Sequence, residues 1–162
     1  MKKDSRVKAV ISLDAVEHNF REMRKNIAEE TKMIAVIKAD AYGHGAVPVA
    51  HLIEDYDYIW GFAAATAEEA IHLREAGITK PILILGIVLM NIFRNLSVMR
   101  SVLQCANMRR QGNFQTKRFC RKKTVHIHIA LDTGMTRIGF CGCTGKCRGK
   151  LKKIFRTSKI LD

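Results

Sequence analysis

Short apolar segments recur in the first half of the chain, and a helical pattern separates each one from the next. The segments at residues 33–37, 59–63 and 82–85 are predicted to be strands, whereas residues 46–53 and 66–77 are predicted to be helices. Strands that alternate with helices at this spacing are typical of parallel β/α units. Spacing alone does not separate a β/α barrel from a doubly wound sheet, so both architectures fit the pattern.

Capping residues and apolar spacing support the same alternation of helices and strands. Asp14 can cap a helix ahead of the first strand, and the apolar residues that follow are spaced for one helical face: Val16, Phe20, Met23 and Ile27. Thr66 and Glu69 form a capping-box pattern at the start of a later helix. We therefore expect a helix before the first strand and one after the second.

Lys38 stands where the first strand ends and a glycine-punctuated loop begins. The carboxyl ends of strands are where α/β folds place their chemistry. Lysine is rarely buried without a partner, and a desolvated amine has a lowered pKa that favours the nucleophilic form needed to react with an aldehyde. Pyridoxal phosphate is the leading candidate aldehyde. The alternative is a lysine whose stem lies along a strand end with its amine in solvent.

The sequence VIKADAYGHG at residues 36–45 resembles the cofactor-attachment signature of the alanine racemase family. The similarity extends to further segments, which are residues 9–15, 18–20, 61–63, 84–86 and 124–140. The resemblance implies a pyridoxal-phosphate enzyme with a β/α barrel followed by a β-rich domain. It also implies alanine as the substrate and a homodimer in the intact family.

The resemblance assigns roles to individual residues. Lys38 would hold the cofactor and act as the base on one face of the substrate's Cα. Tyr42 would donate to the phosphate, and Leu85 would also contact the cofactor. Arg137 would lie near the cofactor's phenolic oxygen and the substrate carboxylate, a role suited to its fork of donors. Alanine stands at position 130, where some members carry a modified lysine that orients this arginine.

The length of 162 residues is short for a complete barrel, which usually takes about 250 residues. We expect a single partial barrel domain over residues 1–162, an α/β fold with parallel strands, without the C-terminal β domain. The family's second base is a tyrosine from that domain of the partner subunit, and nothing here matches it. We therefore predict that the truncated chain does not racemise alanine and folds poorly, because sheet edges and apolar faces stay unpaired.

Charge divides the chain into two parts. Residues 1–88 hold 11 Lys or Arg and 13 Asp or Glu, whereas residues 89–162 hold 17 Lys or Arg, two acidic residues and all five cysteines. Family-like sequence covers residues 6–88 and 123–140. We hypothesise that the basic segments 89–122 and 141–162 are translated out of frame after frameshifts and end at a premature stop. A divergent insertion is the alternative.

Two other functions fit parts of the same sequence. A single-domain protein that holds pyridoxal phosphate without racemase activity is one alternative, and a basic nucleic-acid-binding protein is another. No nucleic-acid motif is present, so no specific nucleic acid is expected as a partner. The spacing of Cys141, Cys143 and Cys147 suits zinc poorly, so no metal is expected. The longest apolar run, at residues 82–90, falls short of the roughly 20 residues that span a bilayer, and a cytoplasmic protein without a membrane partner is expected.

Overall fold

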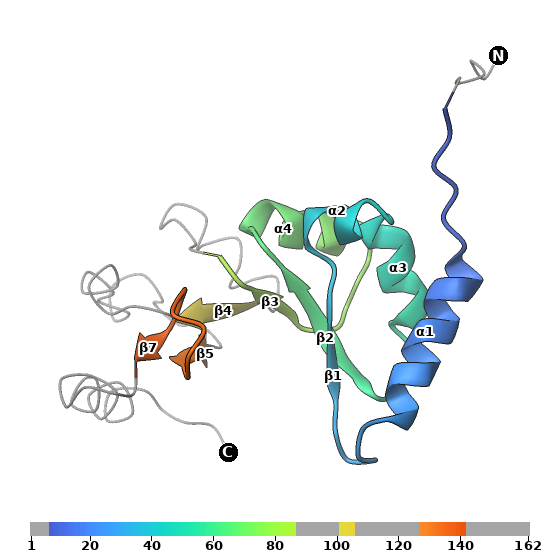
Figure 1. Cartoon of the computed structure of the whole chain (residues 1–162). Coiled ribbons are helices and arrows are strands. Elements are labelled where there is room, and N and C mark those ends of the chain that lie inside the picture. Colours follow the sequence, from blue (N-terminus) through green and yellow to red (C-terminus); the bar gives the residue numbers. More distant parts are fainter. Residues whose placement is uncertain (1–6, 87–100, 106–126, 142–162) are drawn as a thin grey trace. The chain divides into compact units, whose positions relative to one another are not determined.

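The structure, a computed structural model, describes residues 7–86, 101–105 and 127–141 (Figure 1). The chain divides into two units, Met1–Ile82 and Leu83–Asp162, and each is described by itself. The elements in chain order are α1 (Leu13–Lys25), β1 (Met33–Val36), α2 (Lys38–Tyr42), α3 (Ala46–Ile53), β2 (Ile59–Ala64), α4 (Ala67–Glu75), β3 (Ile82–Ile84), β4 (Ser101–Cys105), β5 (Ile127–Ile129), β6 (Leu131–Asp132) and β7 (Phe140–Cys141).

The first unit is built on parallel strands, as the spacing of its apolar segments predicts. β1 pairs with β2 in parallel, with Val36 opposite Ala63. Just before β3, the carbonyl of Pro81 accepts a hydrogen bond from the backbone N–H of Phe62 at 2.9 Å. A Cβ at Gly61 would lie only 2.3 Å from that carbonyl oxygen, so only glycine allows this close approach. The predicted order of strand, helix, strand, helix and strand is confirmed.

The core of this unit lies between β1, β2 and the helices, which gather on one side of the two strands (Figure 1). Ala35 and Ile37 face the helices and are buried, together with large side chains from β2, α3 and α4: Phe62, Ile53 and Leu73. Ile34 and Val36 point to the opposite face and are 37% and 47% exposed. Parallel sheets are normally covered on both faces. Within the described residues, however, this apolar face is partly exposed.

The helix starts partly follow the sequence patterns. Helix α1 is present, but Asp14 is not its cap. The cap is Ser12, whose hydroxyl accepts the N–H of Ala15 at 3.2 Å. Asp14 is the second residue of the helix, where its negative charge still suits the positive end of the helix dipole. Thr66 caps α4 as predicted, because its hydroxyl accepts the N–H of Glu69 at 3.3 Å.

The second unit contains two pairs of short parallel strands. β4 pairs with β5, with Leu103 opposite Ile127, and β6 pairs with β7, with Leu131 opposite Phe140. The sequence pattern predicts no element over β4, since five residues with two central apolar positions are too short to show a period. The strand predicted over residues 124–131 is shorter here and is interrupted between β5 and β6, while residues 124–126 lie outside the described part. Within the described ranges, no helix is long and apolar enough to cross a membrane.

Candidate functional site

Lys38 and Tyr42, two of the predicted site residues, lie close together at the carboxyl end of β1. Lys38 is half-buried and opens α2, and Tyr42 closes this element with 63% of its surface exposed. The Lys38 Nζ lies 5.9 Å from the centroid of the Tyr42 ring, within the range of a cation–π contact. Among the residues that the structure describes, no carboxylate forms an ion pair with the Lys38 amine.

The backbone that joins these two side chains is left-handed. The φ angles are 51° at Ala39, 52° at Asp40, 52° at Ala41 and 55° at Tyr42. Each such residue costs roughly 1–2 kcal/mol relative to the right-handed conformation. The turn ends at Gly43, which has a φ of 88° at no steric cost. Strained backbone of this kind persists only where its surroundings hold it, and it concentrates at functional sites.

Several hydrogen bonds hold this left-handed turn. The N–H of Ala41 donates to the carbonyl of Ile37 at 2.9 Å. The Oδ1 of Asp40 accepts the N–H of Ala46 at 2.7 Å and so occupies the N-terminus of α3. His44 is exposed, and its Nδ1 lies 2.9 Å from the carbonyl oxygen of Ala41. The histidine is thus engaged with the turn itself.

One side chain from α4 also reaches this turn. The carboxylate of Glu69 accepts the N–H of Ala39 at 3.0 Å on one oxygen and the N–H of Ala65 at 2.7 Å on the other. The sequence pattern predicts only a capping role for Glu69, and it predicts no site role for Asp40. The capping-box pattern that follows the second predicted strand is the one sequence signal for Glu69.

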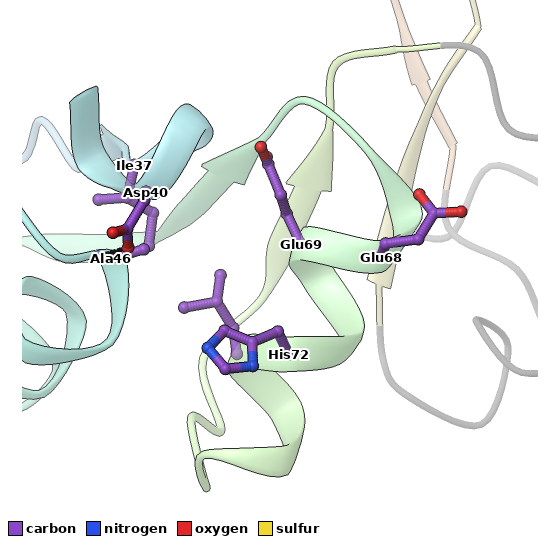
Figure 2. Close-up of a pocket in the computed structure, with 7 residues that line it drawn as sticks. Ile37, Asp40, Ala46, Glu68, Glu69 and His72 are labelled. Carbon is purple, nitrogen blue, oxygen red and sulfur yellow. Dashed lines mark hydrogen bonds between the residues drawn. The ribbon is translucent and has the colours of Figure 1, made fainter. Parts of the chain in front are cut away.

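A cavity of about 380 Å³ lies on the helix side of this turn. Figure 2 shows its lining from α2, α3 and α4, with the carboxylate of Glu68 directed away from Asp40 and Ala46. The lining residues are Ile37, Asp40, Ala46, Glu68, Glu69, His72 and Leu73. Lys38 and Tyr42 are not among them, so the cavity is separate from the predicted attachment point. In the described part of the chain, no three His, Cys, Asp or Glu side chains are grouped to hold a metal.

Leu85 and Arg137 lie in the second unit. Leu85 directly follows β3 and is half-buried. Arg137 is exposed in the loop between β6 and β7. Ala130, just before β6, is half-buried and carries no polar side chain that could orient an arginine. Of the cysteines considered for zinc, Cys143 and Cys147 lie outside the described residues.

In the first unit, two neighbouring side chains offer groups that suit pyridoxal phosphate. The ligand requires an accessible amine for its aldehyde and a donor for its phosphate, and Lys38 and Tyr42 supply these groups side by side. Helix N-termini often bind phosphate, but those of α3 and α4 are already occupied by Asp40 and Thr66. The Tyr42 hydroxyl is the donor that the resemblance assigns to the phosphate.

Comparisons with known proteins agree on one family. The family described as "Alanine racemase, N-terminal domain" matches residues 11–146. "Alanine racemase 1" of Caldanaerobacter subterraneus subsp. tengcongensis is 39% identical over 132 residues, which are 80% of this chain and 33% of that protein. An alanine racemase of Clostridium perfringens is 41% identical over 135 residues, 82% of this chain and 34% of its own length.

Solved structures give the same answer for the fold. The alanine racemase of Clostridium difficile 630, in complex with cycloserine, superposes with a TM-score of 0.82 at 31% identity, covering 91% of this chain and 40% of that one. The chain therefore spans about a third of the length of the curated relatives it matches. The likeness identifies the parallel strands as part of a β/α barrel and decides against the doubly wound sheet.

Proposed function

The chain belongs to the alanine racemase family, and on this premise we propose that it carries the pyridoxal-phosphate attachment site of an enzyme that interconverts L- and D-alanine. One observation carries the proposal. Lys38 lies half-buried at the carboxyl end of β1, with its amine 5.9 Å from the centroid of the Tyr42 ring. This is the pair to which the resemblance of residues 36–45 assigns cofactor attachment and phosphate binding.

The residues of this chain have distinct tasks in the proposed reaction. Pyridoxal phosphate, when bound, supplies an electron sink for the negative charge that develops at the substrate's Cα. The Lys38 amine would hold the cofactor covalently and would take a proton from, or return one to, Cα on one face. The Tyr42 hydroxyl donates to the phosphate. Arg137 pairs with the substrate carboxylate through its guanidinium donors.

Racemisation requires a proton to leave one face of Cα and another to arrive on the opposite face. Lys38 serves one face only. The resemblance assigns the second base to a tyrosine in the C-terminal domain of the partner subunit of a homodimer, and no segment of this sequence matches it. We therefore propose that a polypeptide of these 162 residues binds the cofactor but does not racemise alanine.

The attachment is tested by adding pyridoxal phosphate to the purified polypeptide. The expected result is a visible absorbance band, followed by borohydride reduction and a label that peptide mapping places on Lys38. Lys38→Ala should abolish the band. Lys32→Ala is the matched control, because the amine of Lys32 donates to the carbonyl of Asp57 at 2.9 Å on a different loop. A label spread evenly over the lysines would refute the proposed site.

The activity is tested separately by measuring D-alanine formation from L-alanine. The expected result is no turnover above background for the 162-residue polypeptide with cofactor added. Turnover comparable to that of an intact racemase would refute the proposed need for a second base from outside this sequence.

A further inference from the structure

The turn after Lys38 depends on bonds from its surroundings. Ala39 to Tyr42 are four consecutive residues with positive φ, none of them glycine. L-residues disfavour this conformation, and single residues rather than runs normally adopt it. The turn has hydrogen bonds of its own, such as that from the Ala41 N–H to the Ile37 carbonyl at 2.9 Å. The bond from outside the turn that lies nearest to Lys38 is the one that the Ala39 N–H makes.

Glu69 supplies that bond. In the described part of the chain, it is the one side chain from outside residues 37–46 that hydrogen-bonds to this segment. Its carboxylate spans two backbone groups, at 3.0 Å from the nitrogen of Ala39 and 2.7 Å from that of Ala65. Hydrogen bonds to an ionised carboxylate are about twice as strong as those between neutral groups. Glu69 thus joins the end of β1 to the end of β2.

The capping box of α4 is modified to make this connection. In the usual arrangement, the glutamate three residues after the cap reaches back to the N–H of the cap residue itself. Thr66 performs its half of the motif, but the Glu69 carboxylate binds the N–H groups of Ala65 and Ala39 instead. The sequence motif that predicts a helix start therefore also serves the neighbouring strand end.

We propose that Glu69 is a positioning residue for Lys38. The N–H of Ala39 and the carbonyl of Lys38 belong to one planar peptide group. A carboxylate that fixes this N–H therefore fixes the backbone plane from which the lysine side chain projects toward Tyr42. The inference rests on the proposed function, since positioning matters only if Lys38 attaches the cofactor.

Hydrogen exchange tests the structural half of the proposal in the polypeptide without cofactor. Glu69→Gln keeps the size of the side chain but leaves one oxygen to serve two N–H groups. Glu69→Ala removes both acceptors. The Ala39 amide should exchange about 10- to 100-fold faster in Glu69→Ala. The matched control is Thr66→Ala, which weakens the start of α4 but leaves the carboxylate in place, and there the Ala39 amide should exchange at a rate close to that of the parent.

Cofactor attachment tests the functional half. The rate at which pyridoxal phosphate produces its visible band should fall by about tenfold or more in Glu69→Gln, as expected for the loss of a charged hydrogen bond. It should stay within about twofold of the parent in Thr66→Ala, although both substitutions weaken α4. Circular dichroism and thermal melting of each variant show whether the fold is retained.

Two results would overturn the inference, and they differ from failure of the proposed function. Equal slowing of attachment in Thr66→Ala and Glu69→Gln would assign Glu69 a role in helix stability alone. Unchanged exchange of the Ala39 amide in Glu69→Ala would show that the carboxylate does not hold the peptide. If the parent itself fails to label Lys38, the proposed function fails, and the exchange experiment still decides whether Glu69 holds the turn.

Discussion

The Oδ1 of Asp132 accepts a hydrogen bond from the backbone N–H of Thr136 at 2.9 Å, and this bond closes the loop that leads to Arg137. The same oxygen accepts the N–H of Gly134 at 3.0 Å. The bonds from Thr136 and then Gly134 lower the pKa of the Asp132 carboxyl below its ordinary value of 3.8, because they favour the ionised form. The carboxylate therefore orders the loop from which Arg137 projects.

This loop should loosen in acid. A carboxyl whose pKa is lowered in the folded state stabilises that state above its ordinary value of 3.8, and the effect is lost as the pH falls through the lowered pKa. We expect the amide NMR signals of Gly134 and Thr136 to titrate together with an apparent pKa below 3.8. Asp132→Asn should abolish this titration, and Asp14→Asn should leave it unchanged. A Thr136 amide that does not titrate would contradict the prediction.

Gly61→Ala should destabilise the first unit. Its Cβ would lie 2.3 Å from the carbonyl oxygen of Pro81, and because this neighbour is backbone, the strands must move apart. We expect the free energy of unfolding, measured in urea, to fall by about 1–3 kcal/mol. The amide of Phe62, which donates to the same carbonyl, should exchange faster.

Gly77→Ala is the control for this experiment. Gly77 has a φ of 92° but open space where a Cβ would lie, so the substitution strains only its own backbone. It should lower stability without changing exchange at Phe62. A Gly61→Ala variant with parental stability would show that the strands tolerate a wider separation.

Local patterns predicted much of the first unit. Residues 46–53 were expected to be a helix and form α3 with the same bounds, since an apolar helical segment follows directly on glycine. The capping box correctly located the start of α4. The cap of α1 was misplaced by two residues, because Ser12 and Asp14 are both good caps and only the backbone conformation at Ser12 distinguishes them.

Features that depend on distant residues were not predictable from these patterns. The left-handed turn at Ala39 to Tyr42 was expected to be a loop, since alanine carries no signal for positive φ and the support from Glu69 comes from 30 residues away. β4 was missed for a related reason, because its pairing with β5 defines it rather than its own five residues. Lys38 was predicted from its place at a strand end as well as from the resemblance, whereas the prediction for Tyr42 relied on the resemblance alone, and both roles stay predictions.

Tyr42→Phe tests the phosphate contact assigned to Tyr42. The ring that faces the Lys38 amine is kept, so the cation–π contact should remain and only the hydroxyl is lost. We expect the affinity for pyridoxal phosphate to fall by about 10- to 100-fold, as for the loss of a hydrogen bond to a charged group. Binding is measured from the visible absorbance. Pyridoxal, which lacks the phosphate, is the matched control ligand and should bind parent and variant equally. Equal weakening for both ligands would assign the effect to the ring environment instead.

The basic segment at residues 89–122 leads to a prediction about the gene. It contains no acidic residue, although the family match extends over residues 11–146 and so includes it. If it is translated out of frame, one of the other two reading frames of its nucleotide sequence should encode racemase-like residues with acidic side chains.

The strand β4, Ser101–Cys105, makes this test informative, because it lies within the segment and pairs in parallel with β5. A restored frame should also encode an apolar strand near this position, since the barrel requires one between β3 and β5. If neither frame restores family-like sequence, the segment is an in-frame divergent insertion and the frameshift hypothesis is wrong. In that case the positive charge of residues 89–122 belongs to the in-frame sequence of this protein.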